Sequence, residues 1–401
     1  MLSLAGRFLI ALWHVVGLAL LALLAVEFAV EGWRRANRWL RYRRAAGRDS
    51  AALADAHGGA DWAHRYFNEF RRGVRIDWKP YVEWWQRPFR GDYLTLDARG
   101  LRPTPGEDTA EPLAVRILCF GGSTMMGMGA RDAATIPAAL SRRLGELGHA
   151  AAVTNYGQLG HNLTQETITL QQLLKSGERI DIAIFYDGAN EMACAEQTGR
   201  ADGMFNEARR RAEFNLLHPQ RHGALVAAAL ISALPRTVRR LRRLTGAELR
   251  GPFPHPAVDL LQIDPAALAR DVVALYVANL RLIRSLAAEY RFRPLFFWQP
   301  VITTKRVKSA DEQRWEADYT HQPELRRTLY AAIVAARKAD SGLGAATDAF
   351  DFSGLFDAVA EPIYIDLYHL SEAGNETVAE AMLPAVMAAV EAIVKRDGAG
   401  V

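Results

Sequence analysis

Short apolar runs alternate with longer amphipathic stretches along the chain from residue 113 onward. The runs have the length and the Val, Ile and Phe content of buried strands, and they lie at 113–120, 151–155, 180–186 and 294–298. The stretches between and after them carry apolar residues at helical spacing, so helices are expected at 135–147, 165–175, 265–290, 324–339 and 377–395. Strands that alternate with helices of this length form parallel sheets. The pattern therefore predicts an α/β fold, a three-layer α/β/α sandwich with a parallel sheet.

Polar and glycine-rich segments follow the predicted strands. Three of them, 120–124, 155–160 and 187–191, come directly after strands, and a fourth, 366–375, precedes the last predicted helix. Open parallel sheets bind their ligands at the carboxyl ends of the strands. We therefore expect the functional residues of this chain in these four segments.

One set of residues from these segments has the composition of a serine nucleophile with a base, a carboxylate that orients the base, and oxyanion donors. Ser123 stands on the turn after the first strand, and a serine hydroxyl needs a base that removes its proton. Asp366 and His369 are three residues apart, so one turn brings the carboxylate to an imidazole nitrogen. The backbone N–H groups of Ser123 and Gly160 and the side-chain amide of Asn190 supply donors for an oxyanion hole.

Each piece also has an ordinary structural explanation. A glycine-rich turn after a strand is common, Gly160 is typical of a bend, and Asn190 or Asp366 is typical of a turn or helix cap. Two other motifs fit less well. No lysine follows as in a phosphate-binding P-loop, and Asp132 stands where a dinucleotide-binding motif has its third glycine. The four segments together, in this order and at strand ends, favour the catalytic interpretation.

The ordered segments resemble the SGNH hydrolases, the GDSL-like lipase and esterase superfamily, over residues 113–395. The Asp-x-x-His-Leu-Ser-x-x-Gly-Asn motif at 366–375 is the most specific match. The resemblance implies a flavodoxin-like sheet, Ser123 as nucleophile, Asp366 and His369 as its partners, and Gly160 and Asn190 in the oxyanion hole. The chain departs from the family pattern at Gly122, where the family has Asp, and at Glu191, where it has Asp. Neither position carries a proposed catalytic group, so we expect these departures to affect the substrate more than the mechanism.

The N-terminus contains nineteen residues without a charge, at 8–26. As a helix this segment is about 28 Å long, close to the roughly 30 Å thickness of the hydrocarbon core of a bilayer. A cleaved signal peptide has a shorter apolar region that ends in a small-residue cleavage site. The segment predicts one transmembrane helix within an anchor at 1–32.

The positive charge of the chain is concentrated next to this segment. The formal net charge is +4, but residues 33–48 alone carry seven arginines and no acid, together with Trp33, Trp39 and Tyr42. This composition is typical of a juxtamembrane segment rather than of a nucleic-acid-binding surface, although a solvated basic helix has the same composition. The positive-inside rule favours a cytoplasmic position for the large domain. The family resemblance favours the periplasm, since similar membrane-anchored bacterial proteins modify acyl groups of the cell envelope. Both topologies stay open, with a weak preference for the periplasm.

The remaining segments complete the expected domain organisation. Residues 33–112 form a basic juxtamembrane helix followed by an aromatic-rich connector that packs on the main domain, since free linkers are poor in aromatic residues. Within the hydrolase domain at 113–395, residues 196–264 form an insertion, and 396–401 form a tail. The insertion holds an apolar run at 224–233 and five arginines between 236 and 243. It is either an interfacial lid or, more often for such a pattern, an amphipathic helix with a solvated basic face.

The expected activity is that of a membrane-anchored ester hydrolase that needs no metal or organic cofactor. The resemblance implies an acylated small molecule, glycan or lipid as substrate, and no nucleic-acid partner. An O-acyltransferase that passes the acyl group to a sugar hydroxyl is an alternative within the same chemistry. A non-catalytic glycan- or lipid-binding module with the same fold is a second alternative. The two cysteines, Cys119 and Cys194, are too few for a disulfide framework.

Overall fold

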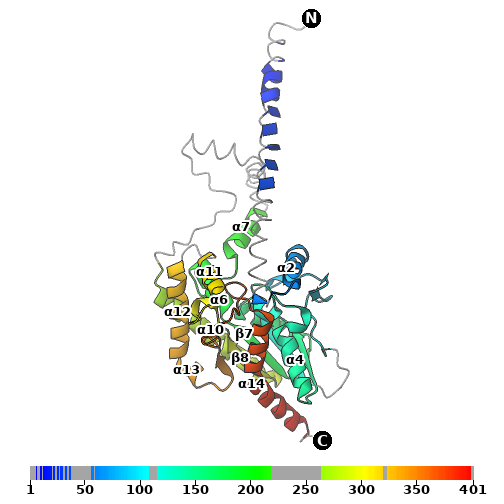
Figure 1. Ribbon diagram of the computed structural model, residues 1–401, viewed down its shortest axis with the longest axis vertical. Coiled ribbons are helices and arrows are strands. Elements are labelled where there is room, and N and C mark those ends of the chain that lie inside the picture. The colour runs from blue at the N-terminus through cyan, green and yellow to red at the C-terminus, as the bar shows by residue number, and fades with distance from the viewer. Residues whose placement is uncertain are drawn as a thin grey trace. The chain divides into compact units, whose positions relative to one another are not determined.

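The chain forms two compact units in a computed structural model (Figure 1). One unit comprises Ser50–Asn206 and Ala257–Val401, and the other comprises Met1–Asp49 and Glu207–Pro256. The structure describes residues 56–57, 59–107, 115–217, 263–318 and 323–398, together with scattered positions between 6 and 37.

A five-stranded parallel sheet organises the larger unit. Its strands lie in the order β6-β5-β7-β8-β9, and every neighbouring pair is parallel. They are β5 (Val115–Gly121), β6 (Ala151–Asn155), β7 (Ile182–Asp187), β8 (Arg293–Trp298) and β9 (Ala349–Asp351). The predicted parallel sheet is confirmed, and β9 is the one strand of it that the sequence pattern missed. Three residues with two of them half-buried give too little apolar periodicity to be recognised.

Helices cover both faces of this sheet, which confirms the three-layer prediction. The longer helices are α4 (Ile136–Glu146), α5 (Leu163–Lys175), α6 (Ala189–Thr198), α10 (Pro265–Tyr290), α12 (Pro323–Ala339) and α14 (Glu372–Gly398). The shorter ones are α3 (Ser123–Met126), η1 (Asp132–Ala134), η4 (Ile302–Thr304), α11 (Ala310–Asp318) and α13 (Ser341–Gly344).

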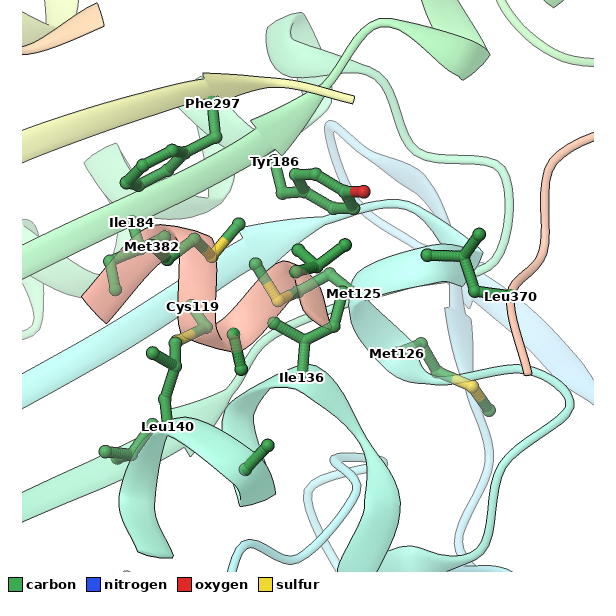
Figure 2. Packing of buried hydrophobic residues seen from close by; sticks show 14 of the residues in the cluster. Cys119, Met125, Met126, Ile136, Leu140, Ile184, Tyr186, Phe297, Leu370 and Met382 are labelled. Atoms are coloured by element: carbon green, nitrogen blue, oxygen red, sulfur yellow. The ribbon is translucent and has the colours of Figure 1, made fainter. Parts of the chain in front are cut away.

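Alternate residues of each strand point into two separate hydrophobic cores. From β5, Ile117 and Cys119 join the core under α4 and α14, whereas Leu118 and Phe120 join the core under α5, α10 and α12. This alternation follows from the two-residue period of a strand. Figure 2 shows the first core, in which Cys119, Leu140 and Met382 meet between the sheet and its helices.

The helices begin where capping residues satisfy their first N–H groups. The side chain of Thr135 accepts from Ala138 N at the start of α4, and that of Asp264 accepts from Ala266 N at the start of α10. At α5, Asn162 and Gln165 form a reciprocal capping box. These local signals explain why α4 and α10 begin within one residue of their predicted positions.

The chain before the sheet adds a helix and two small antiparallel hairpins to the same unit. Helix α2 spans Trp62–Gly73. The first hairpin pairs β1 (Ile76–Lys79) with β2 (Glu83–Gln86), and the second pairs β3 (Phe89–Arg90) with β4 (Thr95–Leu96). These elements correspond to the aromatic-rich connector.

Helix α14 is long and apolar enough to cross a membrane by length and composition, over Glu372–Arg396. In the structure it packs on the sheet, where Val378, Met382, Val386 and Val390 are fully buried in the first core. These contacts account for its composition as that of a core helix.

Two predicted features fall wholly or partly outside the described residues. The described positions between 6 and 37 are helical, in agreement with a helix through 8–26, and whether that helix spans a membrane stays a prediction. Of the insertion, residues up to 217 are described, including α7 (Glu207–Leu217) in the smaller unit. The apolar run at 224–233 and the arginines after it lie outside the described residues.

Candidate active site

Ser123 is the first residue of α3, directly after the glycines that end β5. Met125 and Met126 of α3 are fully buried in the first core, which anchors the turn (Figure 2). As the first helical residue, Ser123 has a backbone N–H without a partner inside α3. The turn therefore holds both the hydroxyl and the N–H of Ser123 at the carboxyl edge of the sheet.

Three side chains from distant parts of the chain are hydrogen-bonded in series at this edge. His369 Nε2 lies 2.7 Å from Ser123 Oγ, and His369 Nδ1 lies 2.6 Å from Asp366 Oδ2. The side chain of His369 is 11% exposed and that of Asp366 is 21% exposed. In this arrangement one imidazole nitrogen faces the hydroxyl while the carboxylate orients the ring through the other.

Asp366 is held by its own loop as well as by the imidazole. Its Oδ1 accepts hydrogen bonds of 2.8 Å from the backbone N–H groups of Tyr368 and His369. Burial raises the pKa of Asp366, but the charge of His369 and these hydrogen bonds outweigh it, so the pKa lies below its ordinary value. The carboxylate is thus ionised when it faces the imidazole.

A buried ion pair supports the approach to this loop. Lys305 Nζ contacts both carboxylate oxygens of Glu312, at 2.8 and 2.7 Å, and both side chains are almost fully buried. Glu312 Oε1 also accepts from the backbone N–H groups of Ile363 and Tyr364. These bonds fix the backbone just before Asp366.

Asn190 and the loop that carries Gly160 lie beside Gly122, the residue before Ser123: a Cβ on residue 122 would meet Asn190 Nδ2 and the carbonyl of His161. Asn190 Nδ2 donates one hydrogen bond of 2.6 Å to the carbonyl of His161, and an amide nitrogen has a second hydrogen to donate. Gly160, the residue before His161, has φ +71°, in the left-handed region that favours glycine. The hydrogen bond therefore ties Asn190 to the loop that carries Gly160.

The two departures from the family pattern lie in this same arrangement. A Cβ atom on residue 122 would lie 1.9 Å from Asn190 Nδ2, so the glycine makes room for the amide. Glu191 accepts from Leu163 N at 2.8 Å with one oxygen and from Gly188 N at 2.7 Å with the other. It thereby joins the start of α6 to the start of α5. That these departures affect the substrate more than the mechanism stays a prediction.

Two further carboxyl groups are buried near Glu191. Glu166 and Asp187 are 1% and 4% exposed. Burial and the nearby charges of Asp187 and Glu191 raise the pKa of Glu166, and burial and the charge of Glu191 raise that of Asp187. Both carboxyls titrate above their ordinary range because burial disfavours the charged form and the neighbouring carboxylates repel it.

The β1–β2 hairpin is bonded to the loop that carries Gly160. Trp84 Nε1 donates to the carbonyl of Leu159 at 2.6 Å, and His161 Nε2 lies 3.1 Å from the carbonyl of Trp84. Gln158 Oε1 accepts from the backbone N–H of Gln86 at 3.0 Å. The expected packing of the connector on the main domain is therefore present, and it reaches the predicted site.

The turn after Ser123 is held from the same side. The guanidinium of Arg102 is fully buried, and it donates to Asp132 Oδ1 and to the carbonyls of Met126, Gly127 and Ala130. Tyr66 of α2 accepts from Gly129 N at 3.0 Å. Both residues precede the sheet in sequence, and both fix the backbone that follows Ser123.

Sequence reasoning named Ser123, Gly160, Asn190, Asp366 and His369 as candidates but missed the residues that hold them. The missed residues are Tyr66, Trp84, Arg102, His161, Lys305, Glu312 and Glu191 in its bridging role. The density of aromatic residues before the sheet was the available signal, and it indicated packing without indicating the partner. Among the described residues, no group of three or more His, Cys, Asp or Glu side chains is arranged to hold a metal ion.

Comparisons with protein-family models and with curated proteins returned no match. Among solved structures, the chain is similar to the acetyl xylan esterase AlAXEase at 13% identity and a TM-score of 0.36, covering 68% of this chain and 100% of that one. It is also similar to a member of the lipolytic protein G-D-S-L family from Veillonella parvula DSM 2008 at 12% identity and a TM-score of 0.33 (68% and 97% covered). A third likeness is to AlinE4, a SGNH-hydrolase family esterase, at 16% identity and a TM-score of 0.30 (70% and 98% covered).

Proposed function

We propose that the chain is a membrane-anchored serine ester hydrolase of the SGNH type that acts through an acyl-serine intermediate. The observation that carries the proposal is the unbroken series of hydrogen bonds from Ser123 Oγ through His369 to Asp366. A module that only binds a ligand has no need of an ionised carboxylate that is hydrogen-bonded to an imidazole, which in turn is hydrogen-bonded to a serine hydroxyl. The arrangement therefore favours the enzyme over the non-catalytic alternative.

The geometry suggests the following course of reaction. His369 Nε2 takes the proton of Ser123 Oγ as this oxygen forms a bond to the ester carbonyl carbon, and Asp366 stabilises the imidazolium. The carbonyl oxygen becomes an oxyanion, for which Ser123 N–H, Gly160 N–H and the second hydrogen of Asn190 Nδ2 are the proposed donors. The imidazolium then protonates the departing alcohol. Water, deprotonated by His369, attacks the acyl-serine and releases the carboxylic acid and the free serine.

The proposed substrate is an O-acyl ester of an envelope glycan or lipid, hydrolysed outside the cytoplasm. The apolar segment at 8–26 supports a membrane anchor, and the arginines at 33–48 favour the opposite topology. A reporter enzyme fused to the C-terminus and active in only one compartment distinguishes the two. Activity of a cytoplasmic reporter would contradict an envelope substrate without affecting the proposed chemistry.

Replacement of the nucleophile is the direct test of the chemistry. We expect Ser123→Ala to lower kcat for a short-chain aryl ester on the order of 10⁶-fold, as in other enzymes with such a triad. Far-ultraviolet circular dichroism checks that the variant is folded. Ser285→Ala, on the exposed face of α10, is the matched control and should retain full activity. A fluorophosphonate probe should label wild type at Ser123, and labelling at another serine or equal activity of Ser123→Ala would remove Ser123 from the mechanism.

A further inference from the structure

The β1–β2 hairpin exposes aromatic and aliphatic side chains that a soluble surface has no reason to present together. Trp78 is 75% exposed, Tyr81 is 80% exposed and Ile76 is 41% exposed. Trp84, the partner of Trp78 across the hairpin, is by contrast 2% exposed. The hairpin thus uses one tryptophan for packing and turns the other outward.

Exposed arginines flank the two strands of this hairpin in the sequence. Arg72 lies in the last turn of α2, Arg75 directly precedes β1, and Arg87 directly follows β2, and all three are exposed. Residues 62–90 carry seven Lys and Arg against three Asp and Glu, whereas residues 91–401 have a net charge of −3. We call the exposed side chains of Arg72, Arg75, Ile76, Trp78, Tyr81 and Arg87 the hairpin patch.

Two of the three acidic residues of this segment, Glu69 and Asp77, do not neutralise the patch. Glu69 accepts from the backbone N–H groups of Asp92, Tyr93 and Leu94, so it serves the neighbouring turn. Asp77 pairs with Arg87 at 3.2 Å, and both side chains are more than half exposed, so water screens this pair. The patch as a whole stays positively charged.

The hairpin that carries the patch is hydrogen-bonded to loops at the carboxyl ends of the sheet strands, where the proposed active site lies. The bonds from Trp84 and Gln86 attach the hairpin to residues 158–161, and Gln165 Nε2 donates to the carbonyl of Val82 at 2.8 Å. Because these bonds end on the loop that carries Gly160, a surface contacted by the patch lies next to the proposed active site.

We propose that the hairpin patch rests on the headgroup region of an anionic lipid bilayer. Arginine side chains are attracted to anionic headgroups, and tryptophan and tyrosine favour the membrane–water interface because they join an apolar ring to a polar group. This combination of residues, rather than charge or aromaticity alone, selects an anionic lipid surface as the partner. The contact is independent of the ester chemistry and turns the site end of the sheet toward the membrane.

A fluorescent probe on the hairpin tests the proposal in the full chain. Both native cysteines, Cys119 and Cys194, are 0% exposed, so a Trp78→Cys variant offers one accessible thiol for an NBD label. In lipid nanodiscs we expect the NBD emission to shift to shorter wavelength with 30% phosphatidylglycerol, compared with pure phosphatidylcholine. The shift should disappear at 1 M salt, where the screening length is about 3 Å. A label at Leu147→Cys, which lies between α4 and the start of β6 at the amino ends of the strands, should stay in water in both discs.

Charge reversal separates the patch from general electrostatics. Both charge reversals are made in the labelled Trp78→Cys variant. Replacing Arg72 and Arg87 of the patch by Glu should abolish the emission shift. Replacing Arg270 and Arg281 by Glu makes the same change of charge on the exposed side of α10 and should leave the shift unchanged. Equal emission in both lipid compositions, or equal loss in both charge-reversed variants, would overturn the proposal. A probe that responds to a soluble polysaccharide and to neither lipid would assign the patch to a glycan instead. Ester hydrolysis in detergent, measured on the same samples, reports on the proposed function separately.

Discussion

Gly122 and Asn190 illustrate how the absence of one atom shapes the neighbourhood of the nucleophile. Asn190 Nδ2 occupies the volume that a Cβ on residue 122 would need, at 1.9 Å from its ideal position. At the same time the amide is drawn to the carbonyl of His161 by a hydrogen bond of 2.6 Å. The residue types at 122 and 190 are therefore coupled through space.

A methyl group at position 122 should displace the amide and lower activity without unfolding the protein. We expect Gly122→Ala to reduce kcat on the order of 10²-fold, the cost of misplacing a catalytic group by about 1 Å. The matched control is Gly145→Ala within α4, where an added Cβ meets nothing within 4 Å. This control should keep full activity and gain about 1 kcal/mol in the free energy of unfolding, because alanine favours the helix. Unchanged kcat for Gly122→Ala would contradict the coupling.

The buried carboxyl of Glu166 makes the stability of the protein depend on pH. The pKa of Glu166 is raised in the folded state. Its contribution to the free energy of unfolding is therefore complete below the ordinary glutamate pKa of about 4.3, and it is lost as pH rises through the folded-state pKa. Glutamine does not ionise, so Glu166→Gln does not lose this part of the free energy of unfolding as pH rises. The free energy of unfolding of the variant relative to wild type should therefore increase from pH 4.5 to pH 8, as measured by urea denaturation.

Glu178→Gln provides the control for this comparison, since Glu178 is exposed and lies three residues after the end of α5. Its stability relative to wild type should be the same at both pH values. Parallel pH profiles for Glu166→Gln and wild type would show that Glu166 does not hold a raised pKa.

At the scale of elements, the β1–β2 hairpin acts as a brace for the loop at 157–161. Trp84 reaches Leu159 through its indole N–H, and its ring also contacts His161 edge-on at 5.2 Å between centroids. The loop carries the N–H of Gly160, whose position depends on the backbone around it. The brace lies in a different element from every residue of the proposed mechanism.

Removal of the indole N–H should therefore affect turnover as well as stability. We expect Trp84→Phe to lower the free energy of unfolding by more than about 1 kcal/mol, because it removes a hydrogen bond of about that net value and also leaves a cavity where part of a buried ring was. It should lower kcat more than it changes KM. Trp78→Phe, on the facing and exposed position of the same hairpin, should change neither quantity in detergent solution. A Trp84→Phe enzyme with wild-type kcat would limit the hairpin to a structural role.

At the scale of the whole molecule, α14 belongs to the core of the larger unit. Met382→Ala should lower the free energy of unfolding by about 2–5 kcal/mol, because it opens a cavity at a fully buried position. Val394→Ala in the same helix, at a position that is 54% exposed, should stay within about 0.5 kcal/mol of wild type. Chemical denaturation of the purified protein measures both. Equal, small effects would indicate that α14 does not pack on the sheet in solution.

The order of strands and helices was predictable because each element carries its own signal. Four of the five sheet strands and the ends of α4 and α10 follow from apolar periodicity and from the caps of Thr135 and Asp264, which act within a few residues. The contacts of Ser123, His369 and Asp366 were also foreseeable. Parallel strands bring their carboxyl ends to one edge, and Asp366 and His369 are neighbours in one turn.

The environment of these residues was not predictable, because it consists of contacts between segments far apart in the chain. Trp84 and Leu159 are separated by 75 residues, and Arg102 and Ala130 by 28. Such pairs share neither a period nor a motif, and their partners are selected by shape and by the need of buried polar groups for hydrogen bonds. The sequence alone thus determined the architecture and the candidate nucleophile with its candidate base. The tertiary structure determined how Gly122, Glu191 and the hairpin hold the surrounding donors, since those positions depend on packing across the whole domain.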